Sequence, residues 1–545
     1  MKTLADAFWY MPMLIFSLLL TKCGNTTTTT TPDARDSALA TQAWNNSIPG
    51  NFSTQKILKL DSNAIDSFFR RFPDLAGLDT NLTYFYAKRN FNYAWFDQKG
   101  LIEQSGNLLT RIANLRDEGI FKVVPYKKQL DSLLSEVNTE GQPGTEQLLE
   151  LMLSAQYFNF ARWVWDGENK AVSESMKWYL PRKKVSYETY LDSLLSRSDG
   201  SPNLPIYRQY DLLKGFLAEY RKLAESNLFG PPIPSPQKAY KVLEESDSIK
   251  DIRKRLFLLG DYQGDTLSTV YSEDLWQAVK DFQSRSGLRA DGVIGAETVH
   301  ALNITPDDRI KQILVNMERC RWLPLRPDGR YLAVNIPEFK LHVYDADSLL
   351  WSTNVVVGKD LHQTVTFAGD IKYVVFSPYW NVPPSITRNE IVPAMNRNSN
   401  YLARNHMEIT GYNGNLPVIR QKPGRHNSLG LVKFLFPNSH NIYLHDSPAK
   451  SLFNEDQRAF SHGCVRVAEP ARLAQFLLQD DPGWTSSEIE KAMQTGKEKY
   501  VTLEKTVPVF LTYFTAFVDR AGKINFRRDI YNRDGRLADM LISGN

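Results

Sequence analysis

One short segment combines several residue types that catalyse acyl transfer. Residues 461–466 read Ser-His-Gly-Cys-Val-Arg, and His445 lies nineteen residues before Cys464. A cysteine attacks a carbonyl as its thiolate, so it needs a nearby base, room for the acyl group and N–H groups that stabilise the oxyanion. A buried core strand would instead carry alternating aliphatic residues. The pattern therefore indicates a cysteine nucleophile.

Further runs of sequence match a known family. They read Leu-Gly-Leu-Val-Lys-Phe-Leu-Phe-Pro-Asn at 429–438, Ile-Tyr-Leu-His-Asp-Ser-Pro at 442–448 and Arg-Ala-Phe at 458–460. With the cysteine motif they resemble the L,D-transpeptidases with a YkuD-type catalytic domain, which crosslink peptidoglycan through a cysteine. Val-Val-Val-Gly-Lys at 355–359 and Asn-Val-Pro-Pro-Ser-Ile at 381–386 resemble the large, multidomain periplasmic members.

The expected chemistry gives each catalytic candidate a role. Cys464 attacks a peptide carbonyl, while a histidine takes the thiol proton and returns it to the leaving amine. His445 and His462 both qualify, because residues two apart on a strand share a face. The resemblance implies that His445 is the base and that the backbone carbonyl of Asp446 orients its ring. The N–H groups of Gly463 and Cys464 are the candidates for the oxyanion site.

Four residues are candidates for substrate binding. Arg466 either holds a substrate carboxylate or forms a structural ion pair, and both alternatives stay open. Ser461 is a further candidate, and Tyr443 and Trp380 are expected to line the donor pocket. The sequence contains neither a CxxC pair nor an HExxH motif, so no metal site and no cofactor are expected.

The resemblance implies a reaction on peptidoglycan stem peptides. The donor would be a tetrapeptide stem that loses its terminal D-Ala, and the acceptor would be the side-chain amine of another stem's third residue, which gives a 3-3 crosslink. Water as acceptor would make the protein an L,D-carboxypeptidase, and release of a wall-bound lipoprotein is a second hydrolytic variant. A non-catalytic wall-binding scaffold is a further alternative, but it would be expected to lack Cys464 or His445. The expected partners are the stem peptides and the glycan.

Composition bounds the class of protein. The chain has 545 residues, of which 42% are hydrophobic, so it can form about three or four domains with cores of their own. A net charge of +4 is small for this length, so no nucleic-acid partner is expected. Three cysteines make no disulfide framework, and Cys320 is predicted to be a buried packing residue.

The N-terminus indicates export. The apolar run at 8–20 is too short to span a bilayer as a helix, so 1–23 is predicted to be a signal or lipoprotein signal segment. The next segment, 24–50, contains six consecutive threonines and is predicted to be a disordered tether. Cys23 stands where a bacterial lipoprotein is lipidated, but Lys22 replaces the usual small residue. A membrane tether through Cys23 therefore stays open, and the expected location is the periplasm or cell envelope.

Two helical units are predicted before the catalytic region. Apolar residues at three- and four-residue spacing indicate a helical scaffold domain at 51–245, with helices at 66–72, 108–118, 147–165, 185–195 and 207–225. Residues 246–303 resemble the three-helix peptidoglycan-binding module, through Ala-Val-Lys-Asp-Phe-Gln at 278–283 and the glycine-rich turn at 287–295. A small helical bundle that binds nothing is the alternative. A connector is expected at 304–329.

The last part of the chain is predicted to be β-rich. Residues 330–504 form the expected catalytic domain, with β-branched and aromatic residues that predict strands at 331–336, 340–344, 353–357, 371–376, 432–436 and 442–444. The polar stretch 386–430 is predicted to be a capping insertion without strands that acts as a lid. Residues 505–545 are expected to form a closing strand and a docking tail. The fold class is multidomain α+β: a helical scaffold, a three-helix module and a YkuD-type β-rich domain.

Overall fold

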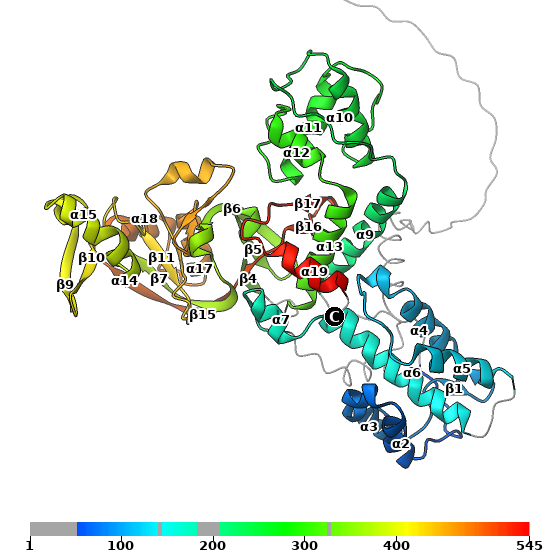
Figure 1. Ribbon diagram of the computed structural model, residues 1–545. Helices are drawn as coiled ribbons and strands as arrows, with labels where there is room; N and C mark the ends of the chain where they lie inside the picture. The colour runs from blue at the N-terminus through cyan, green and yellow to red at the C-terminus, as the bar shows by residue number, and fades with distance from the viewer. Residues whose placement is uncertain (1–51, 140–143, 183–206, 324–328, 544–545) are drawn as a thin grey trace, which may run out of the picture.

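The computed structural model describes residues 52–139, 144–182, 207–323 and 329–543. Figure 1 shows a helical N-terminal region, a small helical module and a β-rich domain, which confirms the multidomain α+β fold class. The predicted signal segment, the tether with Cys23 and the helix at 185–195 lie outside the described residues.

The N-terminal helices pack around one central helix. They are α2 (Asn63–Arg71), α3 (Asp79–Lys88), α4 (Glu103–Ala113), α5 (Lys127–Val137), α6 (Thr145–Ala161), α7 (Lys170–Ser175) and α9 (Gln209–Glu225), with a short hairpin of β1 (Phe96–Asp97) and β2 (Gly100–Leu101). Helices α2, α3, α4 and α5 all contact α6. From Leu149 to Ala161, every residue of α6 except Asn159 is buried. A helix that is apolar on all sides belongs in a core, so α6 is the centre of this region.

The three-helix module has a separate core. It consists of α10 (Asp247–Leu258), α11 (Glu273–Arg285) and α12 (Ala296–Leu302), which share their own cluster of buried apolar residues. The buried Gln283 amide donates to Thr298 Oγ1 at 3.1 Å and to the Val293 carbonyl at 3.0 Å, and its oxygen accepts from Gly292 N at 2.8 Å. Gly292 has φ +72°, and a Cβ there would lie 2.1 Å from Trp276. The turn that the sequence predicted therefore requires a glycine at this position.

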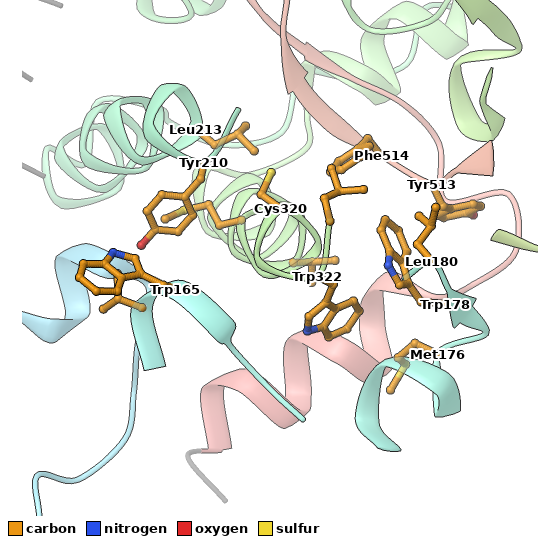
Figure 2. Close-up of a cluster of buried hydrophobic side chains, with 14 of the residues drawn as sticks. Trp165, Met176, Trp178, Leu180, Tyr210, Leu213, Cys320, Trp322, Tyr513 and Phe514 are labelled. Carbon is orange, nitrogen blue, oxygen red and sulfur yellow. The ribbon is translucent and has the colours of Figure 1, made fainter. Parts of the chain in front are cut away.

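The segment predicted to be a connector, 304–329, contains a core helix. Helix α13 (Pro306–Arg321) begins at Thr305, whose side chain accepts from Asp308 N, and it packs against α9. Cys320, near its C-terminal end, is fully buried in the cluster of apolar side chains that Figure 2 shows, which confirms the predicted packing role of this cysteine. The connector prediction is wrong for this helix, because α13 completes the helical region.

The β-rich domain is built on a sheet that closes on itself. Its strands are β4 (Arg330–Asn335), β5 (Lys340–Asp345), β6 (Ser348–Gly358), β7 (Thr366–Phe376), β11 (Val432–Leu435), β12 (Leu444–His445), β13 (Ala459–Ser461), β14 (Val465–Val467) and β15 (Lys499–Thr512). The order is β11-β12-β14-β6-β5-β4-β15-β7-β3, where β3 is Trp178–Tyr179 of the helical region, and β11 also pairs with β7. Strand β13 pairs with β6, and helices α17 (Pro470–Leu478) and α18 (Ser486–Gln494) follow β14 in the chain.

The predicted boundary at 504 cuts through a central strand. Strand β15 runs parallel to β4 and antiparallel to β7, so it belongs to the catalytic sheet. The chain then leaves the sheet as the hairpin of β16 (Ala516–Val518) and β17 (Ile524–Phe526), and ends its described part with α19 (Asp534–Ser543), which packs on α13. Conversely, a strand of the helical region, β3 (Trp178–Tyr179), joins the catalytic sheet by pairing with β7. The helical and β-rich regions therefore share elements from both ends of the chain.

The predicted capping insertion, 386–430, belongs to a small subdomain that contains strands. The prediction that this stretch has no strands is therefore wrong. It contains β8 (Trp380–Asn381), α14 (Pro384–Ile386), the π-helical turn η6 (Thr387–Ile391), α15 (Val392–Arg397), α16 (Tyr401–Arg404), β9 (Met407–Asn413) and β10 (Leu416–Gln421). The three strands form a sheet in the order β8-β10-β9. A cluster of Val382, Ile386, Ile391 and Ile419 gives this cap a core of its own.

Candidate active site

The pairing of two short strands brings the predicted residues together. Strand β12 runs parallel to β14, with Leu444 opposite Val465 and His445 opposite Arg466. Leu444 and Val465 are fully buried in the core. Because side chains alternate along a strand, His445 and Arg466 lie on the other face. Tyr443 and Cys464 each precede one of them by two residues and so lie on that same face. The pairing of the two segments extends to them, because Val465 N donates to the Tyr443 carbonyl at 3.2 Å.

His445 is buried and held by its backbone neighbour. Its Nδ1 donates to the Asp446 carbonyl at 2.5 Å, so Nε2 is the basic nitrogen of the neutral ring. Burial lowers the pKa of His445 to about 3, and the positive charge of Arg466 acts in the same direction, while contacts with the Asp446 and Leu429 backbones oppose them. The imidazole is therefore neutral at physiological pH.

The Asp446 carboxylate faces away from the histidine and supports the surrounding loop. Its Oδ2 accepts from Leu431 N at 2.9 Å, and its Oδ1 accepts from Ser447 N at 2.7 Å and from Lys450 Nζ at 2.5 Å. Gly430 comes so close that a Cβ there would lie 2.4 Å from the Asp446 side chain. The backbone carbonyl of Asp446 contacts the imidazole, and its carboxylate fixes the loop.

Cys464 is half-buried and protonated at rest. Its thiol lies 3.7 Å from the Asn441 carbonyl, to which it donates. Burial raises the pKa of Cys464 to about 11, although contacts with Tyr443 and the charge of Arg466 act in the opposite direction. In the part of the chain that the structure describes, no hydrogen bond joins the thiol to His445. The resting pair is thus a neutral thiol and a neutral imidazole.

A tight turn before the nucleophile occupies two of the predicted residues. Ser461 is buried, and its Oγ donates to the Cys464 carbonyl at 2.6 Å and accepts from Gly463 N at 3.1 Å. Ser461 therefore shapes the turn and does not face a substrate, and the Gly463 N–H is unavailable for an oxyanion. Within the described residues, the Cys464 N–H donates to no acceptor, so it stays as the candidate of the predicted pair.

His462 and Trp380 contact the cap. His462 Nε2 lies 2.7 Å from Glu390 Oε1 of η6, and its ring lies 5.1 Å from the His362 ring. The contact with Glu390 directs the His462 Nε2 towards the cap, so His445 is the remaining candidate for the base. Trp380 forms β8 and packs on the apolar cluster of the cap, and its place in the donor pocket stays a prediction.

Arg466 is a cation without an acidic partner. Its Nε is buried and makes no hydrogen bond, and among the described residues no carboxylate forms an ion pair with its guanidinium. Burial lowers the pKa of Arg466, whereas an ionised Cys464 would raise it. The structural ion pair that the sequence left open is therefore not formed within the described chain.

Comparison with known proteins agrees with this geometry. The family model described as "L,D-transpeptidase catalytic domain" matches residues 329–489. This chain carries an L,D-transpeptidase catalytic domain. A model described as "Putative peptidoglycan binding domain" matches residues 245–302, and one described as "Scaffold domain" matches residues 80–217. The resemblances drawn from the sequence are confirmed for the catalytic domain and the three-helix module.

Individual relatives cover only part of the chain. A Haemophilus influenzae protein named "Putative L,D-transpeptidase" is 32% identical over 243 residues, which are 42% of this chain and 49% of that protein. The chain thus spans about half the length of this curated relative. The structure of an L,D-transpeptidase from Mycobacterium smegmatis is 12% identical, with a TM-score of 0.19, over 35% of this chain and 60% of that one. An L,D-transpeptidase structure from Stackebrandtia nassauensis is 18% identical, with a TM-score of 0.20, over 53% of this chain and 100% of that one.

The L,D-transpeptidase domain also contains site residues to which the sequence gave no role. They are Thr364, Glu390, His362 and Asn441, which contact the turn at 461–464 or the thiol itself. A left-handed backbone at Asn441, with φ +55°, presents its carbonyl to the thiol. No spacing rule could have selected these residues, because they meet the cysteine only through the folded loops.

Proposed function

We propose that this protein is an L,D-transpeptidase that forms 3-3 crosslinks in peptidoglycan and releases terminal D-Ala from a tetrapeptide stem. The observation that carries the proposal is the group on one face of β12 and β14: a thiol, a neutral imidazole and a guanidinium that has no ion-pair partner among the described residues. A nucleophile, a base and an anchor for an anionic peptide are the groups that transfer of an acyl group between stems requires.

The first half of the reaction forms a thioester. The Cys464 sulfur attacks the carbonyl of the third residue of the donor stem, and the thiol proton moves to His445 Nε2. The Cys464 N–H, which has no acceptor among the described residues, stabilises the oxyanion. As the C–N bond breaks, the imidazolium returns the proton to the amine of the departing D-Ala.

The second half transfers the acyl group. The amine of an acceptor stem attacks the thioester carbonyl, and His445 takes a proton from that amine. The C–S bond breaks, and the proton passes to the sulfur, which restores the neutral thiol. Because thiol and imidazole are both neutral at rest, each proton moves only when a bond to carbon forms or breaks.

Arg466 is the proposed anchor for a substrate carboxylate. The Arg466 guanidinium forms no ion pair with a carboxylate among the described residues, and a carboxylate from the stem would supply one. Arg466→Gln should therefore raise KM for the donor more than it lowers kcat. A change confined to kcat would refute a binding role and favour an effect on the Cys464 thiol.

The proposed setting is the cell envelope, where the substrate is found. The match to a peptidoglycan binding domain supports a module that holds the enzyme on the wall. Among the described residues, no helix is both long and apolar enough to cross a membrane. Export through the segment at 1–23 and lipidation of Cys23 stay parts of the proposal.

Mass analysis of disaccharide-tetrapeptides incubated with the purified protein tests the reaction. We expect a crosslinked dimer that has lost one D-Ala, and neither dimer nor tripeptide with Cys464→Ala or His445→Gln. Tripeptide without dimer would replace the proposal with an L,D-carboxypeptidase. No product from the unaltered protein would refute both enzymatic activities.

A further inference from the structure

We propose that Tyr531 is a positioning residue for the nucleophile, and that it acts through Thr364 to aim the Cys464 N–H at the reacting carbonyl. This inference rests on the proposed function, because it assumes that Cys464 attacks a carbonyl. Tyr531 lies outside residues 329–489, the part of the chain matched by the catalytic domain model.

The peptide between Gly463 and Cys464 carries the proposed oxyanion donor and is held by Thr364. Thr364 Oγ1 donates to the Gly463 carbonyl at 2.8 Å. In a trans peptide the carbonyl and the following N–H point in opposite directions. A Gly463 carbonyl fixed on Thr364 therefore directs the Cys464 N–H away from Thr364. Gly463 has φ +113°, a conformation that glycine adopts readily, so this peptide needs external support to keep one orientation.

Thr364 is itself held in place. Its Oγ1 accepts from Gly358 N at 2.9 Å, which sets the direction in which the hydroxyl proton points. Thr364 is fully buried, and the backbone around it is tightly packed. A Cβ at Gly358 would lie 2.0 Å from the His362 carbonyl, 2.8 Å from Thr364 N and 3.1 Å from Gly463 Cα. Movement of the loop at 358–364 would therefore move the nucleophile turn.

A single hydroxyl joins both ends of this loop. The Tyr531 hydroxyl donates to the Gly358 carbonyl at 2.6 Å and accepts from Thr364 N at 3.1 Å. Arg533 of the same segment donates to Gln363 Oε1 at 3.1 Å. No other described side chain bonds to both the Gly358 carbonyl and Thr364 N. Loss of the Tyr531 hydroxyl would thus remove one hydrogen bond from the Gly358 carbonyl and one from Thr364 N, both in this loop.

Tyr531 is itself fixed in place. Its ring is buried and stacks on Tyr513, with centroids 5.5 Å apart and an interplanar angle of 24°. Its backbone N–H donates to the Tyr513 hydroxyl at 2.8 Å, which in turn donates to Asp529 Oδ1 at 2.6 Å. Tyr513 directly follows β15, so the support reaches the site from the central strand of the catalytic sheet.

The test separates carbonyl chemistry from thiol chemistry. Acylation of Cys464 by a carbapenem β-lactam develops an oxyanion, whereas alkylation by iodoacetamide displaces iodide and develops none. Tyr531→Phe should slow acylation about tenfold or more, because a misaligned oxyanion donor loses much of its effect, and should change the alkylation rate less than about twofold. Tyr210→Phe is the matched control, because it removes a buried hydroxyl from the helical region.

A second pair of variants tests the same route without Tyr531. Thr364→Val should reproduce the selective loss of acylation, and Thr364→Ser, which keeps the hydroxyl, should restore it. Equal rates for Tyr531→Phe and the unaltered protein, or equal losses of acylation and alkylation, would overturn the inference. Failure of the cysteine mechanism would look different, because the unaltered protein itself would then form no thioester, and loss of crosslinking alone would leave thioester formation intact.

Discussion

The resting state of the Cys464 and His445 pair leads to a quantitative prediction about thiol reactivity. Burial raises the pKa of Cys464 to about 11 and lowers the pKa of His445 to about 3, so neither group is charged near pH 7. A cysteine protease with a thiolate and imidazolium pair would behave in the opposite way, because its thiol ionises well below pH 7. The pH dependence of alkylation distinguishes the two states.

The expected magnitude follows from the fraction of thiolate. With a pKa of about 11, about 0.03% of Cys464 is ionised at pH 7.5, compared with about 10% for an unperturbed cysteine of pKa about 8.5. The less acidic thiol gives a thiolate that is about tenfold more nucleophilic. Alkylation of the folded protein at pH 7.5 should therefore be about thirtyfold slower than alkylation of the same cysteine in the denatured chain.

The assay is iodoacetamide labelling between pH 6 and pH 10, read as the modified fraction of the peptide that contains Cys464. Peptide mapping keeps Cys464 separate from Cys320, which is fully buried, and from Cys23. The rate should rise about tenfold per pH unit across this range. A rate that becomes constant below about pH 8 would show a preformed thiolate and would refute the neutral resting pair.

Three further outcomes follow from the same geometry. In the folded protein His445 stays neutral down to a pKa of about 3, whereas in the unfolded chain a histidine is protonated below a pKa of about 6.5. The free energy of unfolding should therefore fall by about 2.7 kcal/mol between pH 7.5 and pH 4.5. In urea unfolding, His445→Gln should lack this fall, and the control His300→Gln should retain it. Gly430→Ala combines φ +65° with a clash against the Asp446 side chain and should lower stability by about 2 kcal/mol or more in the same assay, and an unchanged midpoint would contradict the tight approach. A carbapenem should raise the intact mass by one drug molecule, and a shift that persists in Cys464→Ala would exclude this cysteine as its target.

The sequence predicted most of the catalytic sheet because its strands carry a clear signal. β-Branched and aromatic residues mark β4, β5, β6, β7 and β11, and each of these strands lies within a few residues of its predicted range. The cap hairpin was missed because both its faces are largely polar or exposed: Tyr412 and Val418 point to solvent. The two residues between β9 and β10, Gly414 and Asn415, are a hairpin signal that could have revealed it.

Helix α13 shows why the connector prediction failed. Glu318, Arg319 and Arg321 are charged residues at the end of the helix, and a pattern of charges is typical of an exposed segment. In the structure all three are buried, because Arg321 pairs with Glu318 at 2.7 Å and Arg319 pairs with Asp534 at 2.8 Å. The pair of Arg319 with Asp534 joins segments that are far apart in the sequence, and such a pair is invisible to local patterns, so a core helix resembled a link.

The same limit applies to the site. The resemblance selected Cys464 and His445, and the parallel register of β12 and β14 then explains their common face. The Ser461 side chain and the Gly463 N–H are both engaged in hydrogen bonds of one turn, at 461–464. No rule of residue spacing predicts these hydrogen bonds. Trp380 was predicted to line the donor pocket, and its strand belongs to the cap. The sequence named candidate residues for the site, but it could not give their hydrogen-bond partners.

The C-terminal segment links all three units of the molecule, and this arrangement constrains how the enzyme can move on the wall. Arg527 donates to the carbonyl of Arg285 at the end of α11 in the three-helix module, at 2.8 Å, while Asp534 pairs with Arg319 of α13. Between them, Tyr531 contacts the loop beside the nucleophile. The module also meets the catalytic domain directly, through an ion pair of 3.0 Å between Arg289 and Asp456. A module held at both places is not a freely tethered unit, because the two contacts fix its orientation relative to the catalytic domain.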